Sequence, residues 1–291
     1  MAETAVEALE QQTWLNTAAE PLTGVVRGAY ERMGDTGRAL RNFLHGTWLG
    51  HPLHPVFTDI PIGAWTTAAV LDATETCTRD RAYGRAADVA IGVGLAGAAG
   101  AALTGLTDWS ETDGDAKRLG MVHGLLNIGA TALCASALVM RRNGARGTGR
   151  AVGFLGMAVA YGSSYFGGAL VYRHRIGVTH AADTALDKAA PALPSDDLAE
   201  GEKTCVDVQG SAIMLARQHG KVCALAEHCS HLGGPLSEGT LKDGSIVCPW
   251  HASEFGLRDG HVINGPATHP QPHFDVKEKD GSIRVAPPKH K

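Results

Sequence analysis

Long apolar stretches without charged residues fill the middle of the chain. Three such stretches, with no Asp, Glu, Lys or Arg, lie at residues 89–107, 121–140 and 151–172. Each is close to the roughly 20 residues that a helix needs to cross a bilayer. A fourth, residues 55–73, is interrupted by Asp59 and Asp72. A buried bundle in a soluble protein would not need three uncharged stretches of this length. We therefore predict an all-α bundle of four transmembrane helices, at roughly 56–75, 87–107, 119–140 and 151–172.

The second predicted span carries small residues at every fourth position. The two rows are Gly92-Ala96-Gly100 and Gly97-Ala101-Gly105. Rows of this kind let neighbouring helices approach closely in lipid. We therefore expect a multi-pass protein of the plasma membrane, with close helix contacts and a lipid-facing surface.

Four spans would put both ends of the bundle on one side of the membrane. Trp48, Trp109 and Tyr172 would then lie at that boundary, where aromatic residues are common. The positive-inside rule leaves the side open, because basic residues flank the helix ends on both sides. The opposite loops carry Arg79, Arg81, Arg85, Arg141, Arg142, Arg146 and Arg150. No twin-arginine signal for export of a folded domain opens the chain, so we favour the cytoplasmic side for the C-terminal part.

The chain changes character after Asp183, where it becomes polar, and Pro191 and Pro194 mark a linker. Short β-like runs follow, separated by Asp-Gly turns at 243–244, 259–260 and 280–281. This pattern predicts an all-β C-terminal domain. We divide the chain into an N-terminal segment (1–44), a four-helix membrane domain (45–178), a linker (179–195) and a β domain (196–288).

The β domain contains two short segments that each supply one cysteine and one histidine. These metal-ligand candidates are Cys229, His231, Cys248 and His251. A two-iron cluster with thiolates on one iron and imidazoles on the other would use such a set. Zinc also accepts two cysteines and two histidines. A zinc finger, however, pairs its cysteines in one segment and its histidines in another, which favours the cluster here.

The same segments resemble the Rieske family, through Cys-Ser-His-Leu-Gly-Gly-Pro-Leu (229–236) and Cys-Pro-Trp-His-Ala-Ser-Glu-Phe (248–255). Gly-Pro-Ala-Thr-His-Pro-Gln-Pro (265–272) is similar to the proline loop that covers the cluster in that family. The resemblance implies a [2Fe-2S] cluster, with Cys229 and Cys248 on one iron and His231 and His251 on the other.

Several positions depart from the cytochrome bc type of Rieske protein. Gly234 and Trp250 stand where that type has two disulfide-bonded cysteines. Ser253 matches a serine that donates a hydrogen bond to a cluster sulfur, but Phe255 replaces the tyrosine that supplies a second donor. Fewer donors imply a lower reduction potential, so the domain looks like a Rieske-type ferredoxin.

The membrane half resembles an uncharacterised family of bacterial membrane domains with four predicted helices. Gly-Thr-Trp-Leu-Gly-His-Pro-Leu-His-Pro (46–55), Asp-Ile-Pro-Ile-Gly-Ala-Trp (59–65) and Val-His-Gly-Leu-Leu-Asn (122–127) carry the resemblance, with Gly-Gly-Ala-Leu-Val-Tyr-Arg-His (167–174). The family implies a fold but names no activity.

Four histidines fall near one predicted membrane depth, at the helix ends on the side of the β domain. They are His51, His54, His123 and His174. Histidine within a membrane segment is a functional hypothesis, and two imidazoles on neighbouring helices could ligate haem b. A quinone pocket is a further candidate. The plain alternative is that these histidines bond to backbone or to lipid headgroups.

These features together predict a membrane-anchored one-electron carrier. The net charge of −4 and pI of about 6.4 give no basic surface for nucleic acid. An oxygenase needs a further mononuclear iron domain, and we see none after His251. We therefore expect an electron-transfer protein or oxidoreductase component rather than a stand-alone enzyme. Its donor and acceptor, protein or quinone, are not identified by the sequence. The alternatives are a redox sensor and a component of a Rieske oxygenase system.

Overall fold

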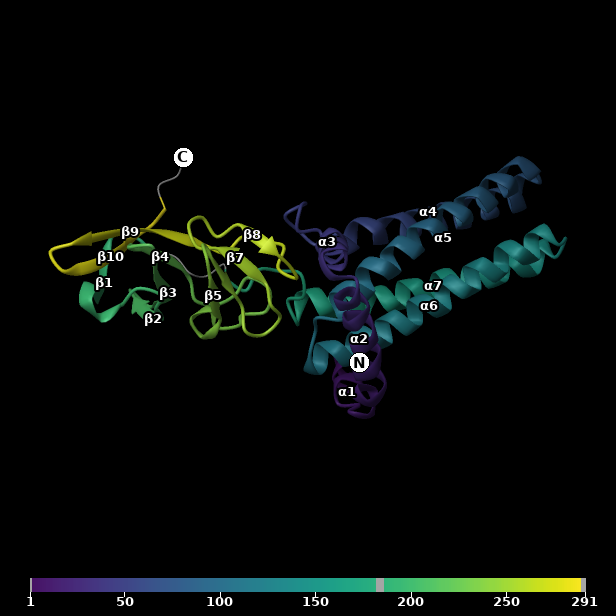
Figure 1. The fold of residues 1–291 in the computed structure, drawn as a ribbon. Helices are drawn as coiled ribbons and strands as arrows, with labels where there is room; N and C mark the ends of the chain where they lie inside the picture. The colour runs from purple at the N-terminus through teal and green to yellow at the C-terminus, as the bar shows by residue number, and fades with distance from the viewer. Residues whose placement is uncertain (1, 182–185, 289–291) are drawn as a thin grey trace. The chain divides into compact units, whose positions relative to one another are not determined.

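Helices occupy the first part of the chain and strands the last part, as predicted (Figure 1). The structure is a computed structural model, which describes residues 2–181 and 186–288. The helices are α1 (Ala2–Glu10), α2 (Trp14–Arg32), α3 (Gly34–His45), α4 (His54–Thr78), α5 (Arg81–Trp109), α6 (Gly114–Arg142) and α7 (Arg146–Tyr172).

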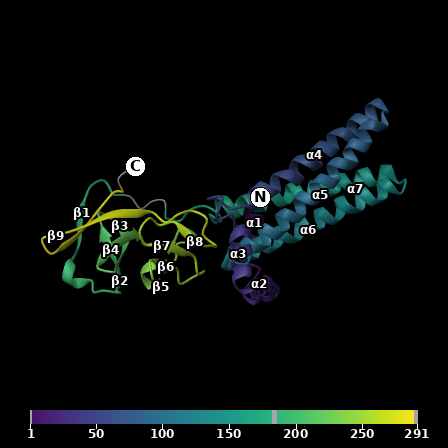
Figure 2. The same cartoon turned by 45° about the horizontal axis from the view of Figure 1, so that its top comes forward.

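The four long helices form two hairpins, in which α4 lies along α5 and α6 lies along α7 (Figure 2). Glycines of α5 allow the two helices of the first hairpin to pack closely against each other. Gly94, Gly97, Gly100 and Gly105 lie against Trp65, Ile60, Phe57 and His54 of α4, and none has room for a Cβ. Gly92, by contrast, faces open space. Three of the six residues in the two small-residue rows, Gly97, Gly100 and Gly105, therefore bring α4 and α5 together.

Three helices in the described part of the chain are long and apolar enough to cross a membrane, namely α5, α6 and α7. The four-span prediction is thus met in part. Helix α4 has 25 residues, which is sufficient length. It carries Asp59, Asp72 and Glu75, and these carboxylates lower its apolar character.

Ion pairs join the two hairpins at the end of the bundle where α4 and α6 finish. We call this set the hairpin clamp, and its members are Asp72, Glu75, Asp88, Arg141, Arg146 and Arg150. Every pair links an acid of α4 or α5 to an arginine of α6 or α7. The sequence analysis treats these arginines as loop charges, whereas the structure pairs them with carboxylates. They therefore stabilise the bundle as well as flank its helix ends.

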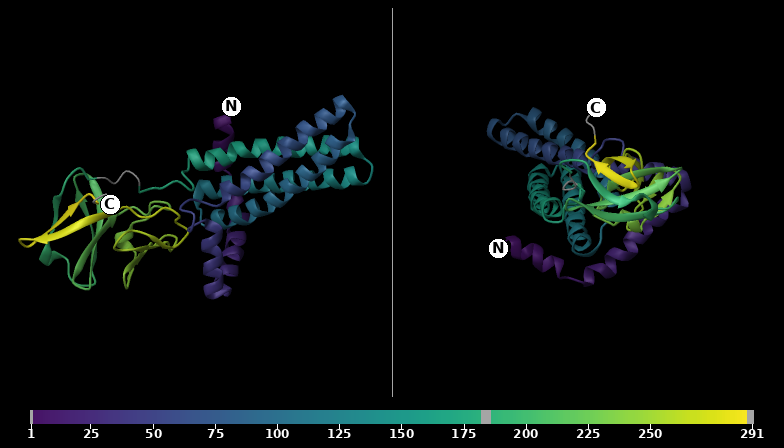
Figure 3. Two further views of the ribbon diagram at one scale, coloured as in Figure 1. Left: turned by 90° about the horizontal axis from the view of Figure 1, so that it is seen from above. Right: turned by 90° about the vertical axis from the view of Figure 1, so that its left-hand side faces the viewer.

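Helices α1 and α2 lie across the opposite end of the bundle (Figure 3). The Tyr30 and Thr107 hydroxyls are 2.7 Å apart, and Arg27 lies 3.4 Å from the Glu111 carboxylate. The Arg118 guanidinium donates to the Glu10 carbonyl. These polar contacts attach the N-terminal helices to α5 and α6.

Two antiparallel sheets form the C-terminal part. A six-stranded sheet has the order β1-β10-β9-β4-β3-β2, and a four-stranded sheet has the order β5-β6-β7-β8. The strands are β1 (Ala190–Pro194), β2 (Lys203–Val208), β3 (Ser211–Gln218), β4 (Lys221–Ala226), β5 (Thr240–Lys242), β6 (Ser245–Val247), β7 (Glu254–Gly256), β8 (Val262–Asn264), β9 (His273–Lys279) and β10 (Ser282–Ala286). Strand β1 lies within the segment expected as a linker, residues 179–195, and pairs with β10.

Strand β3 separates two hydrophobic cores, because side chains alternate between the faces of a strand. Ile213 and Leu215 enter the core formed with β9 and β10. Met214 and Ala216 enter the second core, which also contains Cys229, Cys248 and Phe255. Burial on both faces explains why β3 reads as a continuous apolar run. The second core is the one that carries the metal-ligand candidates.

The described chain forms two compact units. One consists of the helices up to residue 37 together with residues 53–174. The other consists of the chain from residue 175 onward together with residues 38–52, the end of α3 and the loop after it. Sequence order alone would assign residues 38–52 to the helical part.

Candidate metal centre

The first ligand loop, residues 229–236, is a tight turn that follows β4. The Cys229 amide donates to the Gly234 carbonyl at 2.9 Å, and the Gly233 amide donates to the Cys229 carbonyl at 2.8 Å. Gly233 has φ +81°, a conformation that glycine adopts without steric cost. Local hydrogen bonds therefore close the turn that presents Cys229 and His231.

The second ligand loop joins β6 to β7 and has the same kind of closure. The Cys248 amide donates to the Ser253 carbonyl at 2.8 Å, and the Ala252 amide donates to the Cys248 carbonyl at 3.2 Å. Ala252 has φ 58°, which is uncommon for a residue with a side chain. This loop presents Cys248 and His251.

The structure brings the four candidates together as two pairs of like residues. The Cys229 and Cys248 thiols are hydrogen-bonded to each other, and the imidazole centroids of His231 and His251 are 5.0 Å apart. Among the residues described, no three His, Cys, Asp or Glu side chains gather around one point as a single ion would require. The Nδ1 atom of His231 is buried and has no hydrogen-bond partner in the structure. The site thus presents a thiol pair, an imidazole pair and a buried His231 nitrogen without a hydrogen-bond partner.

The electrostatics of the site favour the ligand form in two of these groups, Cys248 and His231. The hydrogen bond between the thiols raises the pKa of Cys229 and lowers the pKa of Cys248 to about 7. Burial lowers the pKa of His231, and the neighbouring imidazoles of His251 and His45 act in the same direction. Metal ligation requires thiolate and neutral imidazole, so one thiol and the His231 ring are prepared for it.

Gln271 stabilises the first ligand loop through hydrogen bonds, and its side chain is only 1% exposed. Its Oε1 accepts from the Ser230 amide at 2.8 Å, and its Nε2 donates to the carbonyls of Ala226 and His228, both at 2.7 Å. The sequence analysis places Gln271 in the proline loop but assigns it no role. A glutamine in a polar loop gives no signal that its amide is buried.

The structure shows what surrounds the positions that were compared with the cytochrome bc type, namely Gly234, Ser253 and Phe255. A Cβ on Gly234 would lie 2.8 Å from the Cys248 sulfur and 3.0 Å from the Trp250 ring, so no side chain fits there. Ser253 is fully buried, and its Oγ accepts from the Ala267 amide at 3.0 Å. Its hydroxyl hydrogen can then point to another acceptor, such as a sulfur. Phe255 is fully buried in the second core and offers no donor.

A loop of residues 264–267, which we call the cover loop, lies beside the second ligand loop. Asn42 of α3 holds it: Oδ1 accepts from the Gly265 amide at 2.9 Å, and Nδ2 donates to Asn264 Oδ1 at 3.1 Å. Nothing in the sequence predicted a role for Asn42. Partners this far apart in the chain leave no local pattern.

The four histidines of the helical part have different surroundings. His54 donates from Nδ1 to the Ala101 carbonyl at 2.9 Å, and His123 donates from Nδ1 to the Ser163 carbonyl at 2.9 Å. His174 instead bonds through Nε2 to the Glu10 carboxylate at 2.7 Å. His51 is exposed and belongs to the other unit. The structure therefore places His54 against α5, His123 against α7 and His174 against α1.

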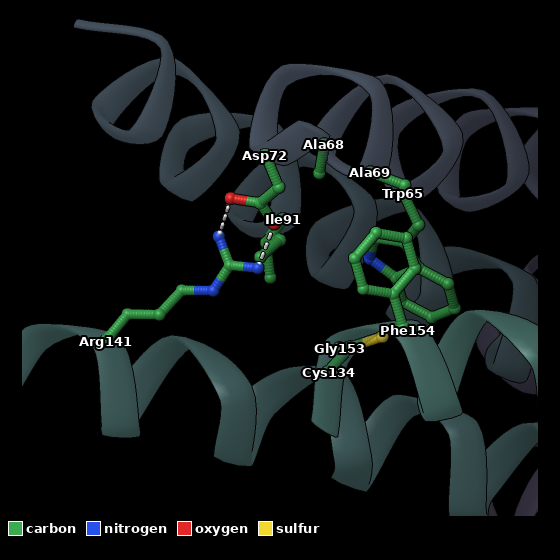
Figure 4. Close-up of a pocket in the computed structure, with 9 residues that line it drawn as sticks. All are labelled: Trp65, Ala68, Ala69, Asp72, Ile91, Cys134, Arg141, Gly153 and Phe154. Carbon is green, nitrogen blue, oxygen red and sulfur yellow. Dashed lines mark hydrogen bonds and ion pairs between the residues drawn. The ribbon is translucent and has the colours of Figure 1, made fainter. Parts of the chain in front are cut away.

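A small pocket lies beside the hairpin clamp (Figure 4). The Asp72–Arg141 pair forms one wall and Trp65 another, with Cys134 and Phe154 completing the lining. Its lining is mainly apolar and its main charges are paired with each other. It adds no ligand set to the candidates above.

Both family resemblances are confirmed by comparison with known proteins. Residues 188–277 match the Rieske [2Fe-2S] domain, and residues 50–180 match a family described as a predicted membrane protein (DUF2231). The 3-phenylpropionate/cinnamic acid dioxygenase ferredoxin subunit of Escherichia coli K12 is 36% identical over 95 residues, which are 32% of this chain and 89% of that protein.

Two further proteins share this part of the chain. Human apoptosis-inducing factor 3 is 30% identical over 89 residues, and the chain spans only 15% of its length. The ferredoxin of carbazole 1,9a-dioxygenase from Nocardioides aromaticivorans IC177 is a solved structure with 30% identity and a TM-score of 0.34. The match covers 35% of this chain and 100% of that one.

Proposed function

Because the chain belongs to the Rieske [2Fe-2S] family through residues 188–277 and to the DUF2231 family through residues 50–180, we propose that it is a membrane-anchored one-electron carrier. In this proposal Cys229 and Cys248 bind one iron, and His231 and His251 bind the other. The observation that carries it is the arrangement of the candidates as a thiol pair and an imidazole pair. The domain limits expected from the sequence, 45–178 and 196–288, remain part of the proposal.

When bound, the cluster would take up and release one electron, and the residues around it would set its reduction potential. Gln271 and Ser230 hold the first loop in place through their hydrogen bonds. By its match to the family's serine, Ser253 would donate to a sulfur, and the buried side chains of Leu236 and Phe255 exclude water from the core side. Hydrogen-bond donors to the cluster sulfurs and the exclusion of solvent both influence the reduction potential of such clusters. With phenylalanine at position 255, we infer a potential in the lower part of the Rieske range.

The ferredoxin subunit of a dioxygenase, 36% identical to this domain, supports a ferredoxin-like role. By that likeness, we propose that the donor is a reductase and the acceptor an oxygenase component or another redox protein. The carrier would differ from a soluble ferredoxin in its attachment to the membrane.

The first prediction concerns the cofactor itself. The purified full-length protein should contain iron and acid-labile sulfide in equal amounts, and dithionite should produce an electron paramagnetic resonance signal of a histidine-ligated two-iron cluster. Its average g should lie below that of an all-cysteine ferredoxin, because imidazoles replace two thiolates. Bound zinc without labile sulfide would refute the assignment.

The second prediction concerns membrane anchoring by α5, α6, α7 and, we propose, α4. Cys77 and Cys205 are exposed and are separated in sequence by α5, α6 and α7. Three spans between them would put these thiols on opposite sides. A membrane-impermeant thiol reagent added to sealed vesicles should therefore label one but not the other, and Cys77→Ala and Cys205→Ala assign the labelled site.

Helix α4 is tested in the same vesicles with a thiol placed before it. In a Cys77→Ala, Cys205→Ala background, Trp48→Cys should react from the face opposite to Cys77 if α4 crosses the membrane. Reaction from the same face as Cys77 would show three spans. For a domain on the cytoplasmic side, as we propose, Cys77 should react in intact spheroplasts and Cys205 should not.

The third prediction concerns a second redox centre in the bundle, for which His54 and His123 are the candidates. Both rings donate Nδ1–H to a backbone carbonyl, an arrangement that fixes the ring and leaves Nε2 as the ligating nitrogen. The Asn127 amide lies 3.2 Å from His123 Nε2 and would have to turn away. We propose that these histidines bind haem b. A quinone is the alternative occupant of the same site.

A pyridine-haemochrome spectrum of the purified protein tests this directly. His54→Ala or His123→Ala should each remove or shift the haem bands and leave the cluster signal intact. His174→Ala is the matched control, because its ring is bonded to Glu10, and it should keep the bands. A wild-type protein without haem bands would contradict the haem proposal and leave quinone binding or simple anchoring as the role of the bundle.

A further inference from the structure

The end of α3 and the loop after it contact the β sheets beside the metal centre. We call residues 38–52 the docking segment. Asn42 makes two hydrogen bonds to the cover loop, at 2.9 Å to the Gly265 amide and at 3.1 Å to Asn264 Oδ1. The Arg41 guanidinium lies 3.5 Å from the Gly265 carbonyl. One residue of the cover loop therefore has both its backbone amide and its carbonyl directed at the docking segment.

The fit between the two surfaces is close. A Cβ on Gly265 would lie 3.1 Å from Thr47 Cγ2 and 3.4 Å from His45 Cδ2, so the position tolerates little more than glycine. His45 is only 1% exposed although it ends a helix that is otherwise largely exposed. Complete burial of an imidazole here means that the docking segment is covered by the β part, as at a packed interface.

The cover loop connects this contact to the metal centre. Two residues after Gly265, the Ala267 amide donates to Ser253 Oγ at 3.0 Å. Ser253 also accepts, through its carbonyl, the hydrogen bond from the Cys248 amide. A displacement of the docking segment would thus change the hydrogen bonds of Ser253 and, through them, the position of the ligand Cys248.

We propose that residues 38–52 are a built-in partner of the Rieske domain, docked on its cover loop through Asn42, and that this contact holds the cover loop in place beside the cluster site. Residues 38–52 lie outside the Rieske match at 188–277, so this contact is additional to the family's own domain. The proposal goes beyond the carrier function and rests on it only for the presence of the cluster.

Hydrogen exchange in the full-length protein tests the docking without reference to the cluster. Asn42→Ala removes the acceptor of the Gly265 amide, and exchange of a peptide spanning 262–268 should become roughly five- to thirtyfold faster, the ratio expected for one or two hydrogen bonds. Asn42→Asp keeps an acceptor for the Gly265 amide but loses the donor to Asn264 Oδ1, so its exchange rate should lie between those of wild type and Asn42→Ala. Ala39→Ser, at an exposed position of the same helix, is the control and should not change the exchange.

Loss of the cluster to an iron chelator is the second measurement. It should accelerate in Asn42→Ala by a similar ratio, and in Gly265→Ala as well, while Ala39→Ser stays at the wild-type rate. If Asn42→Ala matches Ala39→Ser in both measurements, the segment is not docked and the proposal is wrong. A wild-type protein without a cluster would instead refute the carrier function, and the exchange measurement would still decide the docking.

Discussion

Replacing Cys248 with alanine should remove the cluster, whereas replacing Cys223 should leave it in place. The Cys248 thiol is one of only two sulfur ligands proposed for the site, and it is held next to Cys229 in the buried second core. Loss of an outer-shell partner alone commonly weakens metal binding by about 10–100-fold, so loss of a ligand should exceed this. Iron and labile sulfide should fall to background, together with the visible absorbance of the cluster.

Cys223 is the matched control for this change. It lies on β4 and packs against the same core, but it is outside both ligand loops. Cys223→Ala should therefore retain iron, sulfide and the paramagnetic signal. Retention of the cluster in Cys248→Ala, or its loss in Cys223→Ala, would show that the ligands are assigned to the wrong residues.

Replacing Asp72 with alanine should destabilise the helical bundle by about 3–5 kcal/mol, the usual cost of leaving one partner of a buried ion pair unpaired. The side chains of Arg141 and Asp72 are only 1% and 2% exposed, and they form two hydrogen bonds. Asp88, 3.3 Å from Arg141, remains as a weaker partner and should keep the loss near the lower end of this range. Thermal unfolding of the helical signal in detergent measures the effect.

Two further variants separate the ion pair from a general effect of altering α4. Asp59→Ala changes an exposed carboxylate of the same helix and should be close to neutral. Asp72→Ala combined with Arg141→Met removes both charges and should regain most of the lost stability, because no buried charge is left unpaired. Equal unfolding temperatures for Asp72→Ala and Asp59→Ala would mean that the hairpin clamp contributes little.

The order of elements was predictable because it depends on local composition. Uncharged stretches of spanning length predicted α5, α6 and α7, and Asp-Gly turns predicted a β domain after them. The first span was harder to judge. Asp72 looked like an interruption of an apolar helix, and only the arginines of α6 and α7 show why a carboxylate is stable at that position.

The four histidines show that a predicted depth in the membrane does not identify the partner of each side chain. The sequence put His51, His54, His123 and His174 near one level, which says nothing about the direction of each ring. The ring of His174 is bonded to Glu10 of α1, a residue more than 160 positions away, and His51 belongs to the other unit. His54 and His123 bond to backbone carbonyls of α5 and α7, and nothing in the sequence indicates these partners.

By itself, the sequence determined the two families and the identity of the four ligand candidates, because each ligand loop is a short segment closed by its own hydrogen bonds. Glycine and the residues around Cys229 and Cys248 encode those turns locally. The tertiary structure alone decided what surrounds them. Asn42 meets Gly265 across 223 positions, Gln271 reaches Ser230 across 41, and Arg141 reaches Asp72 across 69. Contacts of this kind depend on how separate elements pack, and no periodicity or spacing in the chain records which polar side chains will share a buried position.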